Sequence, residues 1–341
     1  MKVLSLIIPS YNSEAYLHKC IPSFFAEAVL DKLDIIIVND GSTDNTVEAA
    51  QTYCRRYPDS IRLICQENKG HGGALNTGCA AAVGKYLKPV DADDWVETQN
   101  LPELIRLLED CDSDVVLTHY NTIDVSTGEV RRYRSYPKQF GKAMTMDEIM
   151  ADWRNFYRSM TFHGIAYKTE FYQKHSISLS EHVFYEDNEY ATLPCSRAQT
   201  VTPFDLFFYD YRVGDVNQSI SLSNQVKRMG HTQTVIRRMM ADYCTLPEGP
   251  GKRYAAMKTQ GVVLTYLTTA LLAHPNKKEG RKLAAGHMAE CQATAPEIYR
   301  LVLRKYQVYT ILSRLHISKP TWEKFLNSNF YNRLRGSQNF D

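Results

Sequence analysis

The segment Tyr86-Leu87-Lys88-Pro89-Val90-Asp91-Ala92-Asp93-Asp94 gives the strongest indication of the fold. Its first five residues are largely apolar and do not alternate with polar ones, which is typical of a short strand buried on both faces. The last four residues form an acidic cluster where that strand ends. A strand that ends in this way predicts a sheet that carries its chemistry along one edge.

The neighbouring sequence repeats this arrangement. Further strands are expected at Val3–Ile8, Leu33–Val38, Ile61–Cys65 and Val115–His119. Helical patterns lie between the strands, near residues 43–57, 74–83 and 101–109. Repeated strand–helix–strand units predict an α/β domain with a mostly parallel sheet that is covered by helices on both faces.

Polar residues follow three of the four early strands. The clusters are Pro9–Asn12, Asn39–Asp44 and Asp91–Asp94. One such cluster is usually only a turn. In open parallel sheets, however, ligands bind beyond the carboxyl ends of the strands. Three clusters at the same edge therefore predict a ligand site there.

The pattern becomes helical in the C-terminal part of the chain. We expect a sheet domain over residues 1–225 and a helical region over residues 226–341. From Arg300 onward the chain contains eight Lys and Arg residues and two acidic residues, so this segment has a net charge of +6 and the rest of the chain −4. Apolar and aromatic residues interleave with these charges. That mixture fits either a packed helix with a solvated basic face or a helix lying on an anionic membrane.

Composition excludes several classes of protein. The net charge is only +2 and no basic–aromatic patch occurs outside the tail, so no nucleic-acid partner is expected. The eight cysteines contain no CxxC pair, which excludes zinc-site spacing. The longest apolar stretch, Gly261–Ala273, is too short to span a bilayer. With no leader-like start, these features predict a cytoplasmic protein, at most peripheral at the inner face of the membrane. The oligomeric state is left open.

Asp91 and Asp93 carry the chemistry of the acidic cluster. Carboxylates are hard oxygen ligands that suit Mg²⁺ or Mn²⁺. A nucleoside diphosphate would be repelled by them unless a cation lay between. Two carboxylates at this spacing also occur in ordinary loops, and it is their place at a strand end that favours a cation site.

Two other acidic segments each allow a functional and a purely structural interpretation. Asp40 begins Asp40-Gly41-Ser42-x-Asp44-x-Thr46, where its carboxylate could accept a hydrogen bond from a base or ribose. The same segment could be a turn capped by Ser42 or Asp44. Glu186 and Asp187 are flanked by aromatic residues, which would limit water and raise a carboxyl pKa toward that of a general base. A solvated surface pair is the alternative.

Taken together, these elements resemble the family 2 glycosyltransferases, which have the GT-A fold. The resemblance extends over residues 3–221 in a fixed order. It is carried by Ser5-Leu6-Ile7-Ile8-Pro9-Ser10-Tyr11-Asn12, Val38-Asn39-Asp40-Gly41-Ser42, Glu67-Asn68-x-Gly70, Leu75-Asn76-x-Gly78, Asp91-x-Asp93-Asp94-Trp95, Glu186-Asp187, Tyr211-Arg212 and Ser219-Ile220-Ser221. It implies a GT-A domain followed by a helical extension.

The resemblance also assigns roles. Residues that would bind the nucleotide-sugar are Pro9, Tyr11 and Asn12 at the base, Asp40 at the base or ribose, Asp91 at the ribose side, the small Ala92, and Lys69 and Arg212 near the phosphates. Asp93 would hold a divalent metal, Mn²⁺ or Mg²⁺. Asp187 would be the catalytic base, with Glu186 beside it. His163 and His182 are candidates for the acceptor site.

The function implied is an inverting, metal-dependent transfer of a hexosyl or N-acetylhexosaminyl group. The donor would be a nucleotide-sugar, with UDP favoured, and the acceptor a glycan or lipid-linked glycan in cell-surface polysaccharide synthesis. One alternative is a non-catalytic relative that binds nucleotide or glycan. Another is a sugar-nucleotide pyrophosphorylase, which needs a glycine-rich, arginine-bearing loop where this chain has Pro9–Asn12. An NAD-dependent oxidoreductase is disfavoured because no GxGxxG follows the first strand.

Overall fold

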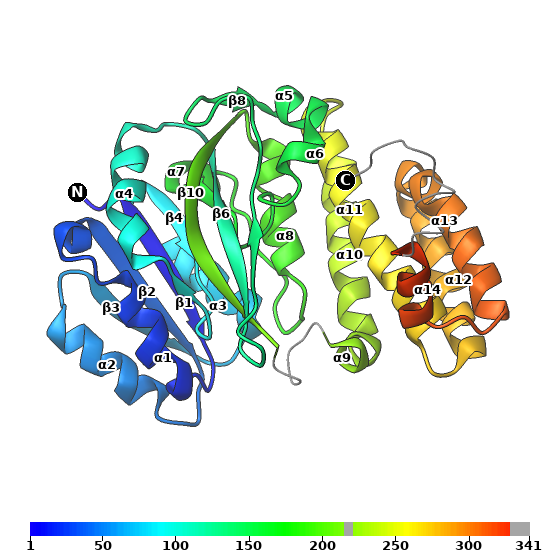
Figure 1. Cartoon of the computed structure of the whole chain (residues 1–341), viewed down its shortest axis with the longest axis horizontal. Coiled ribbons are helices and arrows are strands. Elements are labelled where there is room, and N and C mark those ends of the chain that lie inside the picture. Colours follow the sequence, from blue (N-terminus) through cyan, green and yellow to red (C-terminus); the bar gives the residue numbers. More distant parts are fainter. Residues whose placement is uncertain (215–220, 328–341) are drawn as a thin grey trace. The chain divides into compact units, whose positions relative to one another are not determined.

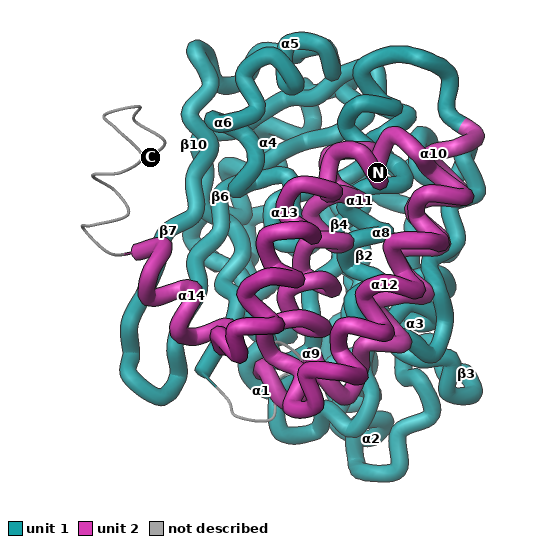
Figure 2. The backbone as a smooth tube through the Cα atoms, turned by 90° about the vertical axis from the view of Figure 1, so that its right-hand side faces the viewer, with its two compact units in different colours: residues 1–218, 246–255 teal, residues 219–245, 256–341 magenta. Residues whose placement is uncertain are grey.

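The computed structural model describes residues 1–214 and 221–327 (Figure 1). The chain forms two compact units (Figure 2). Unit 1 comprises Met1–Gln218 and Leu246–Ala255, and unit 2 comprises Ser219–Thr245 and Ala256–Asp341. Ser219 and Ile220 of the last motif, and Arg333 and Arg335 of the basic tail, lie outside the described residues.

Unit 1 is built on one mixed sheet, whose order is β3-β2-β1-β4-β9-β6-β10-β5, with β7 paired to β6 and β8 to β10. The strands are β1 (Leu4–Ser10), β2 (Leu33–Asp40), β3 (Ile61–Gln66), β4 (Tyr86–Pro89), β5 (Trp95–Val96), β6 (Val115–Asp124), β7 (Val130–Tyr133), β8 (Met144–Thr145), β9 (Ile165–Lys168) and β10 (Thr200–Val213). β1 to β4 are parallel, as predicted. β9 runs antiparallel between β4 and β6.

Helices cover both faces of this sheet, which confirms the predicted layering. Those of unit 1 are α1 (Glu14–Cys20), α2 (Thr46–Arg56), α3 (Gly70–Ala81), α4 (Leu101–Asp110), α5 (Met146–Ala151), α6 (Trp153–Phe156), α7 (Thr169–Lys174) and α8 (Asp187–Thr192). Leu6 of β1 shares a buried core with Leu17 of α1 and Ile105 of α4. Ile7 points the other way, where a Cβ on Gly78 of α3 would lie 2.2 Å from it. Successive residues of a strand face opposite sides, so an unbroken apolar run fills both layers.

Unit 2 is helical in its described residues. It contains α9 (Leu222–Lys227), α10 (Met229–Thr245), most of α11 (Pro250–Thr268), α12 (Lys277–Thr294), α13 (Pro296–Arg314) and α14 (Lys319–Leu326). The apolar stretch predicted as a core helix forms the end of α11 and a following π-helical turn, Thr269–Ala273, with Val263 and Leu267 fully buried. Among the described helices, none has the length and apolar character needed to cross a membrane.

Candidate active site

The strand ends bring the acidic residues of unit 1 to one edge of the sheet. β2, β1 and β4 are neighbours and run parallel, so Asp40, the turn after Ser10 and Asp91 leave the sheet on the same side. The acidic cluster closes as a turn in which the backbone N–H of Asp94 donates to the carbonyl of Asp91 over 3.0 Å. The edge that the sequence predicts as a ligand site therefore holds these polar segments together.

Asp40 is held firmly at the end of β2. It is 2% exposed, and its Oδ1 accepts hydrogen bonds from the backbone N–H of Lys69 at 2.8 Å and from Gln66 at 2.7 Å. The Lys69 side chain is exposed. Its backbone thus joins the β2 edge to the start of α3, independently of any role for its ammonium group.

The turn after β1 is tied to the same edge. Asn12 adopts a left-handed φ of 50°, its N–H donates to Ser42 at 3.0 Å, and its Oδ1 accepts from the backbone of Thr43 at 2.8 Å. Pro9 is buried, whereas Tyr11 is 53% exposed. Of the three residues predicted at the base pocket, Tyr11 and Asn12 are therefore exposed and Pro9 is not.

The three carboxylates of the acidic turn have different surroundings. Asp94 is buried and accepts from the Tyr209 hydroxyl at 2.6 Å and from the backbone N–H of Arg212 at 2.7 Å. Tyr209 also accepts from the backbone N–H of Asp91 at 3.1 Å. Asp93 keeps 38% of its side chain exposed. Asp94 and Tyr209 thus attach the turn to β10, and Asp93 is left facing solvent.

Negative charge is in excess at this turn. Burial, and next the charge of Asp91, raise the pKa of Asp93 to about 6. Burial and both neighbouring carboxylates raise the pKa of Asp94 well above its ordinary value. A cation beside Asp93 would relieve this repulsion.

The chemistry of these ligands suits a hard divalent ion. Within the described residues, no group of three or more His, Cys, Asp or Glu side chains is arranged to hold a metal by itself. Mg²⁺ in enzymes is commonly bound through one or two carboxylates, with substrate phosphates and water completing its shell. The arrangement fits that mode and does not form an all-protein cage.

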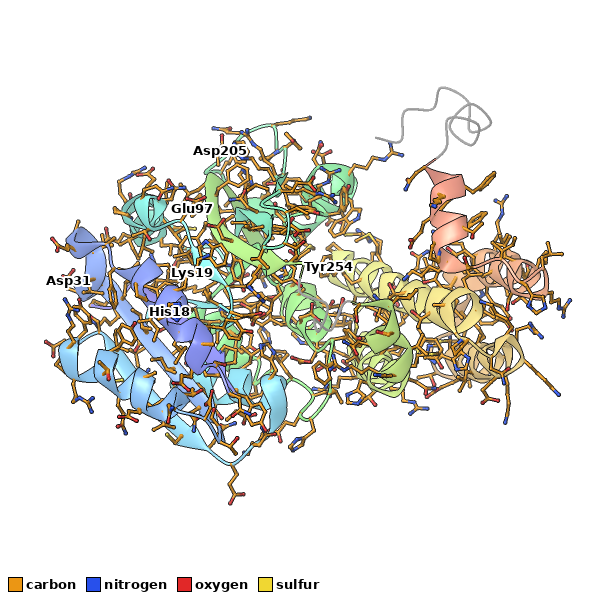
Figure 3. All side chains as sticks on the ribbon, turned by 60° about the horizontal axis from the view of Figure 1, so that its bottom comes forward. His18, Lys19, Asp31, Glu97, Asp205 and Tyr254 are labelled. Carbon is orange, nitrogen blue, oxygen red and sulfur yellow. The ribbon has the colours of Figure 1, made fainter. Side chains whose placement is uncertain are left out.

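Arg212 lies beside the acidic turn. Its guanidinium is 3.9 Å from Oδ2 of Asp93 and stands over the ring of Tyr16, 5.3 Å from the ring centre. Lys19, labelled in Figure 3, extends from the same helix as Tyr16 and stands over the Trp95 ring. The predicted diphosphate ligand is thus next to the predicted metal ligand, on the α1 side of the turn.

Glu186 and Asp187 reach this edge through a histidine. Nδ1 of His71 lies 2.5 Å from Oε1 of Glu186, and Nε2 lies 2.9 Å from Oδ1 of Asp91. Burial alone would lower the pKa of His71, but the two carboxylates, Asp91 foremost, raise it well above its ordinary value. The imidazolium therefore bridges the acidic turn and the start of α8.

Asp187, the predicted base, has a raised pKa. It is the first residue of α8, and burial followed by the charges of Glu186 and Asp91 raises its pKa to about 6. Its amide neighbour Asn188 donates to Oδ1 at 3.0 Å. A carboxyl group with a raised pKa is a stronger proton acceptor near neutral pH than an ordinary aspartate. The solvated surface pair is not what the structure has, because Glu186 is only 3% exposed.

The two acceptor-site candidates are placed differently. The His163 ring stacks on Tyr211 with ring centres 4.2 Å apart, and burial lowers its pKa to about 4. Its pKa is also influenced by Asp91, which puts it within electrostatic range of the acidic turn. His182 is exposed, with a left-handed φ of 55°, and its backbone N–H donates to the carbonyl of Lys69 at 2.9 Å.

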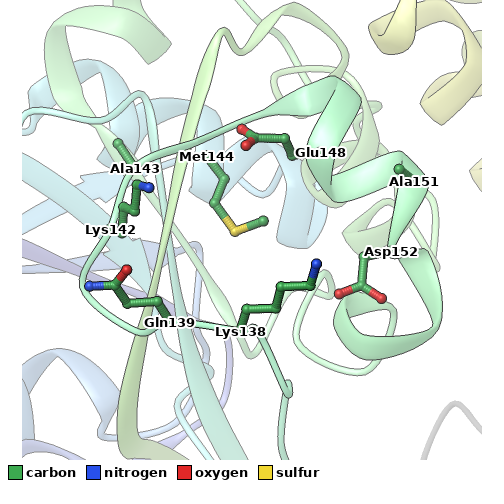
Figure 4. Close-up of a pocket in the computed structure, with 8 residues that line it drawn as sticks. All are labelled: Lys138, Gln139, Lys142, Ala143, Met144, Glu148, Ala151 and Asp152. Atoms are coloured by element: carbon green, nitrogen blue, oxygen red, sulfur yellow. The ribbon is translucent and has the colours of Figure 1, made fainter.

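A pocket of about 600 Å³ lies elsewhere in unit 1 (Figure 4). It is lined by Lys138, Gln139, Lys142, Ala143, Met144, Glu148, Ala151 and Asp152. β8, which contributes Met144, pairs with the first residues of β10, whereas Arg212 is near the other end of that strand. None of the predicted site residues lines this pocket, and we assign it no role in the chemistry.

Sequence reasoning missed the part played by His71 and Tyr209. His71 stands in a glycine-rich turn, which marks a close approach of backbone, but its two partners are 20 and 115 residues away. Tyr209 lies in an aromatic strand and is itself fully buried, so its sequence context indicates an ordinary core residue. The sequence shows a histidine between glycines, but it does not indicate which residues contact that histidine.

The model of Glycosyl transferase family 2 matches residues 5–185. Among curated proteins, the putative glycosyltransferase EpsH of Bacillus subtilis is 31% identical over 163 residues, covering 46% of each chain. The matched stretch thus spans about half the length of such relatives.

Solved structures show the fold. S. aureus TarS residues 1–349, in complex with UDP-GlcNAc, aligns with a TM-score of 0.62 at 17% identity, covering 92% of this chain and 89% of that one. The mannosyltransferase PcManGT of Pyrobaculum calidifontis, in complex with GDP-Man and Mn²⁺, aligns with a TM-score of 0.50 at 19% identity, covering 92% and 86%. The predicted GT-A fold with a helical C-terminal region is confirmed. With more than half of its residues matched by the family model, the chain belongs to glycosyl transferase family 2.

Proposed function

We propose that this protein transfers a sugar from a nucleotide-sugar to a hydroxyl group of a glycan acceptor, with inversion at the sugar carbon. The observation that carries the proposal is a connected group of acids: Asp91 and Glu186 share His71, Asp93 faces solvent beside Arg212, and Asp187 follows Glu186. A donor diphosphate at Asp93 and an acceptor at Asp187 would meet across this group.

Some of these residues would stabilise the leaving group, and another would activate the nucleophile. Asp93 would hold Mn²⁺ or Mg²⁺, which would supply positive charge to the leaving diphosphate. Arg212 would donate to the diphosphate oxygens as negative charge develops there. Asp187 would accept the proton of the acceptor hydroxyl while that oxygen attacks the sugar carbon from the face opposite the diphosphate. A single displacement of this kind inverts the anomeric carbon.

The donor is proposed to be a UDP-sugar carrying a hexosyl or N-acetylhexosaminyl group. TarS, which shares the fold, was solved with UDP-GlcNAc, and PcManGT was solved with GDP-Man, so the fold accepts both bases. Asp40, Asn12 and the exposed ring of Tyr11 would contact the nucleoside. Asp91 would lie on the ribose side, Ala92 leaves room because it has no bulky side chain, and Lys69 could reach a phosphate.

The acceptor is proposed to be a glycan or lipid-linked glycan of a cell-surface polysaccharide, assembled in the cytoplasm. Support comes from aromatic rings close to the acidic group. His163 stacks on Tyr211, and the pKa of Tyr211 is raised by burial and then by carboxylates that include Asp187. Sugar rings present apolar C–H faces that pack on such surfaces. His182, which is exposed, would lie farther out along the acceptor.

The two alternative functions predict different results in an assay of nucleotide release. A non-catalytic relative would bind nucleotide without releasing it from a sugar donor, and a pyrophosphorylase would form or cleave the nucleotide-sugar with pyrophosphate. The proposed enzyme instead releases nucleoside diphosphate in the presence of Mn²⁺, and release increases with acceptor. Parallel reactions with and without added pyrophosphate distinguish the three cases. Release that depends on pyrophosphate would contradict the proposal.

The raised pKa of Asp187 leads to a pH prediction. The base is active when deprotonated, so kcat should fall as pH decreases through about 6, approaching a tenfold loss per pH unit below it. Initial rates at saturating donor between about pH 4 and pH 8 measure this limb. A rate that stays flat down to the ordinary carboxyl pKa, about 4, would contradict the assignment.

We also propose that α13 contacts an anionic membrane surface. Its exposed apolar residues are Leu301, Val308 and Ile311, followed by Leu315 just beyond its end, with exposures of 48%, 40%, 56% and 64%. This spacing places them on one face of the helix. The exposed bases Arg300, Arg304, Lys305 and Arg314 accompany them. Arg304 falls between Leu301 and Val308 on that face, so pairing with a second copy would oppose like charges, whereas an anionic lipid surface would neutralise them.

Vesicle sedimentation tests this contact. Wild-type protein should bind vesicles that contain phosphatidylglycerol more than vesicles of phosphatidylcholine alone, and added salt should weaken binding. The double variant Ile311→Glu/Leu315→Glu should lose most of the bound fraction. Val125→Glu, at a 45% exposed apolar position of unit 1, is the matched control. Equal binding of the double variant and wild type, or concentration-dependent dimers on size exclusion, would contradict the proposal.

A further inference from the structure

The geometry points to His71 as a positioning residue that holds the catalytic-base segment against the donor-binding turn. This inference rests on the proposed function, because it concerns how the base is placed relative to the donor. His71 is distinct from the residues that would touch either substrate. It would act through Asp91 on one side and Glu186 on the other.

The contacts of the imidazole ring support a bridge. Each ring nitrogen is within hydrogen-bond distance of a different carboxylate, 2.5 Å to Glu186 and 2.9 Å to Asp91. Carboxylates only accept hydrogen bonds, so both contacts require an N–H on each nitrogen. Glu186 is 3% exposed and is not free to exchange this partner for water. A buried carboxylate that lost the bridge would be left without its charged partner.

The glycines around His71 allow the base segment to approach. Gly70 has a φ of 75°, and a Cβ there would lie 2.8 Å from the backbone nitrogen of His182. A Cβ on Gly72 would lie 2.2 Å from the carbonyl oxygen of Ser180. The chain that leads to Glu186 therefore packs directly on the first turn of α3. Side chains at these two positions would push it away.

Two further contacts fix the same segment. The backbone N–H and hydroxyl of Ser180 each donate to Glu189 of α8 at 2.7 Å. The side chain of Asn76 donates to the carbonyl of Leu179 at 2.9 Å and accepts from its N–H at 2.8 Å. These contacts hold the segment to α3 and α8, but only His71 links it to the acidic turn among the contacts described here.

Loss of the His71 bridge should affect the position of the catalytic base more than the binding of the donor. Asp187 is bonded directly to Glu186 in the chain, so the position of Glu186 limits where the Asp187 carboxylate can lie. Among the proposed donor contacts, Asp91 is bonded to His71, whereas no hydrogen bond described here joins His71 to Asp40, Asp93 or Arg212, so the donor keeps most of its contacts when the bridge is lost. Losing the bridge should lower kcat and leave the KM for the donor nearly unchanged.

Matched variants separate positioning from folding. In His71→Asn the amide can replace the Nδ1 contact with Glu186, and in His71→Gln it can replace the Nε2 contact with Asp91, but neither side chain spans both. Each is expected to lower kcat by about 10- to 100-fold, the scale of a misplacement of about 1 Å, with donor KM within about threefold. His18→Gln, an exposed histidine on α1 (Figure 3), is the control for the exchange itself.

A double-mutant cycle identifies the route of the effect. If His71 acts through Glu186, then His71→Gln should lower kcat much less in a Glu186→Gln background than in wild type. A residue that only contributes to packing would show additive losses. Additive losses, or a kcat of His71→Gln within twofold of wild type, would overturn the inference.

A spectroscopic measurement does not depend on activity. Long-range ¹H–¹⁵N spectra of the imidazole at pH 8 should show both nitrogens of His71 protonated, and Glu186→Gln should remove that signature. A neutral ring in wild-type protein would overturn the bridge even if the enzyme is active. If the bridge is seen but no nucleotide-sugar is consumed, the proposed function fails and the contact itself stands.

Discussion

Replacing Asp187 by asparagine is expected to lower kcat by about 10²-fold or more, because an amide cannot accept the proton of the acceptor hydroxyl. The side chain keeps its size, so α8 and its contacts should remain. The nucleotide should bind as in wild type, since Asp187 has no place in the proposed donor contacts. Nucleotide release under saturating donor and acceptor measures the loss, and calorimetry measures nucleotide affinity.

The control for this exchange is Asp31→Asn, at an exposed position labelled in Figure 3. It should leave kcat unchanged. Transfer by Asp187→Asn at more than a tenth of the wild-type rate would remove Asp187 from the role of base. A parallel loss of nucleotide affinity would indicate instead that the substitution had disturbed the donor side.

Replacing Asp93 by alanine should remove the metal-dependent part of nucleotide binding and with it nearly all turnover. Asp93 is the most exposed carboxylate described in the acidic turn, and burial and Asp91 raise its pKa to about 6. A divalent cation between it and the diphosphate would turn this repulsion into attraction. Titration of nucleoside diphosphate with and without Mn²⁺ measures the effect.

Wild-type affinity should increase with Mn²⁺, and the affinity of Asp93→Ala should not respond to it. Asp59→Ala, at an exposed position just before the start of β3, is the matched control and should respond like wild type. An Asp93→Ala protein whose affinity still increases with Mn²⁺ would place the metal elsewhere or exclude this mode of binding.

The sheet could be predicted because its signals are local. β1, β2 and β4 are buried, mostly apolar strands, and each is followed by polar residues where the chain leaves the sheet. Parallel neighbours necessarily end on one side, so the edge that holds Asp40 and Asp91 followed from topology alone. The region after residue 121 gave weaker signals. β7 is a short, exposed strand, and β8 has only two residues.

The connection between the acids could not be predicted, because it depends on long-range contacts. Asp94 reads as a third member of an acidic turn, yet it is a buried anchor for Tyr209 of β10, 115 residues away. His71 stands between glycines in the sequence, yet it joins two acidic segments. Sequence spacing gives the order of such residues but not which side chains meet after the chain folds.

A donor screen that measures released nucleotide tests the proposed sugar transfer directly. Wild-type protein with Mn²⁺ would be offered UDP-, GDP- and dTDP-sugars, with the Asp187→Asn protein as the blank. We expect that at least one donor, most simply a UDP-sugar, loses its nucleotide with wild type and not with the variant. Nucleotide release that is equal in the two proteins, or absent with every donor and glycan acceptor tried, would contradict it.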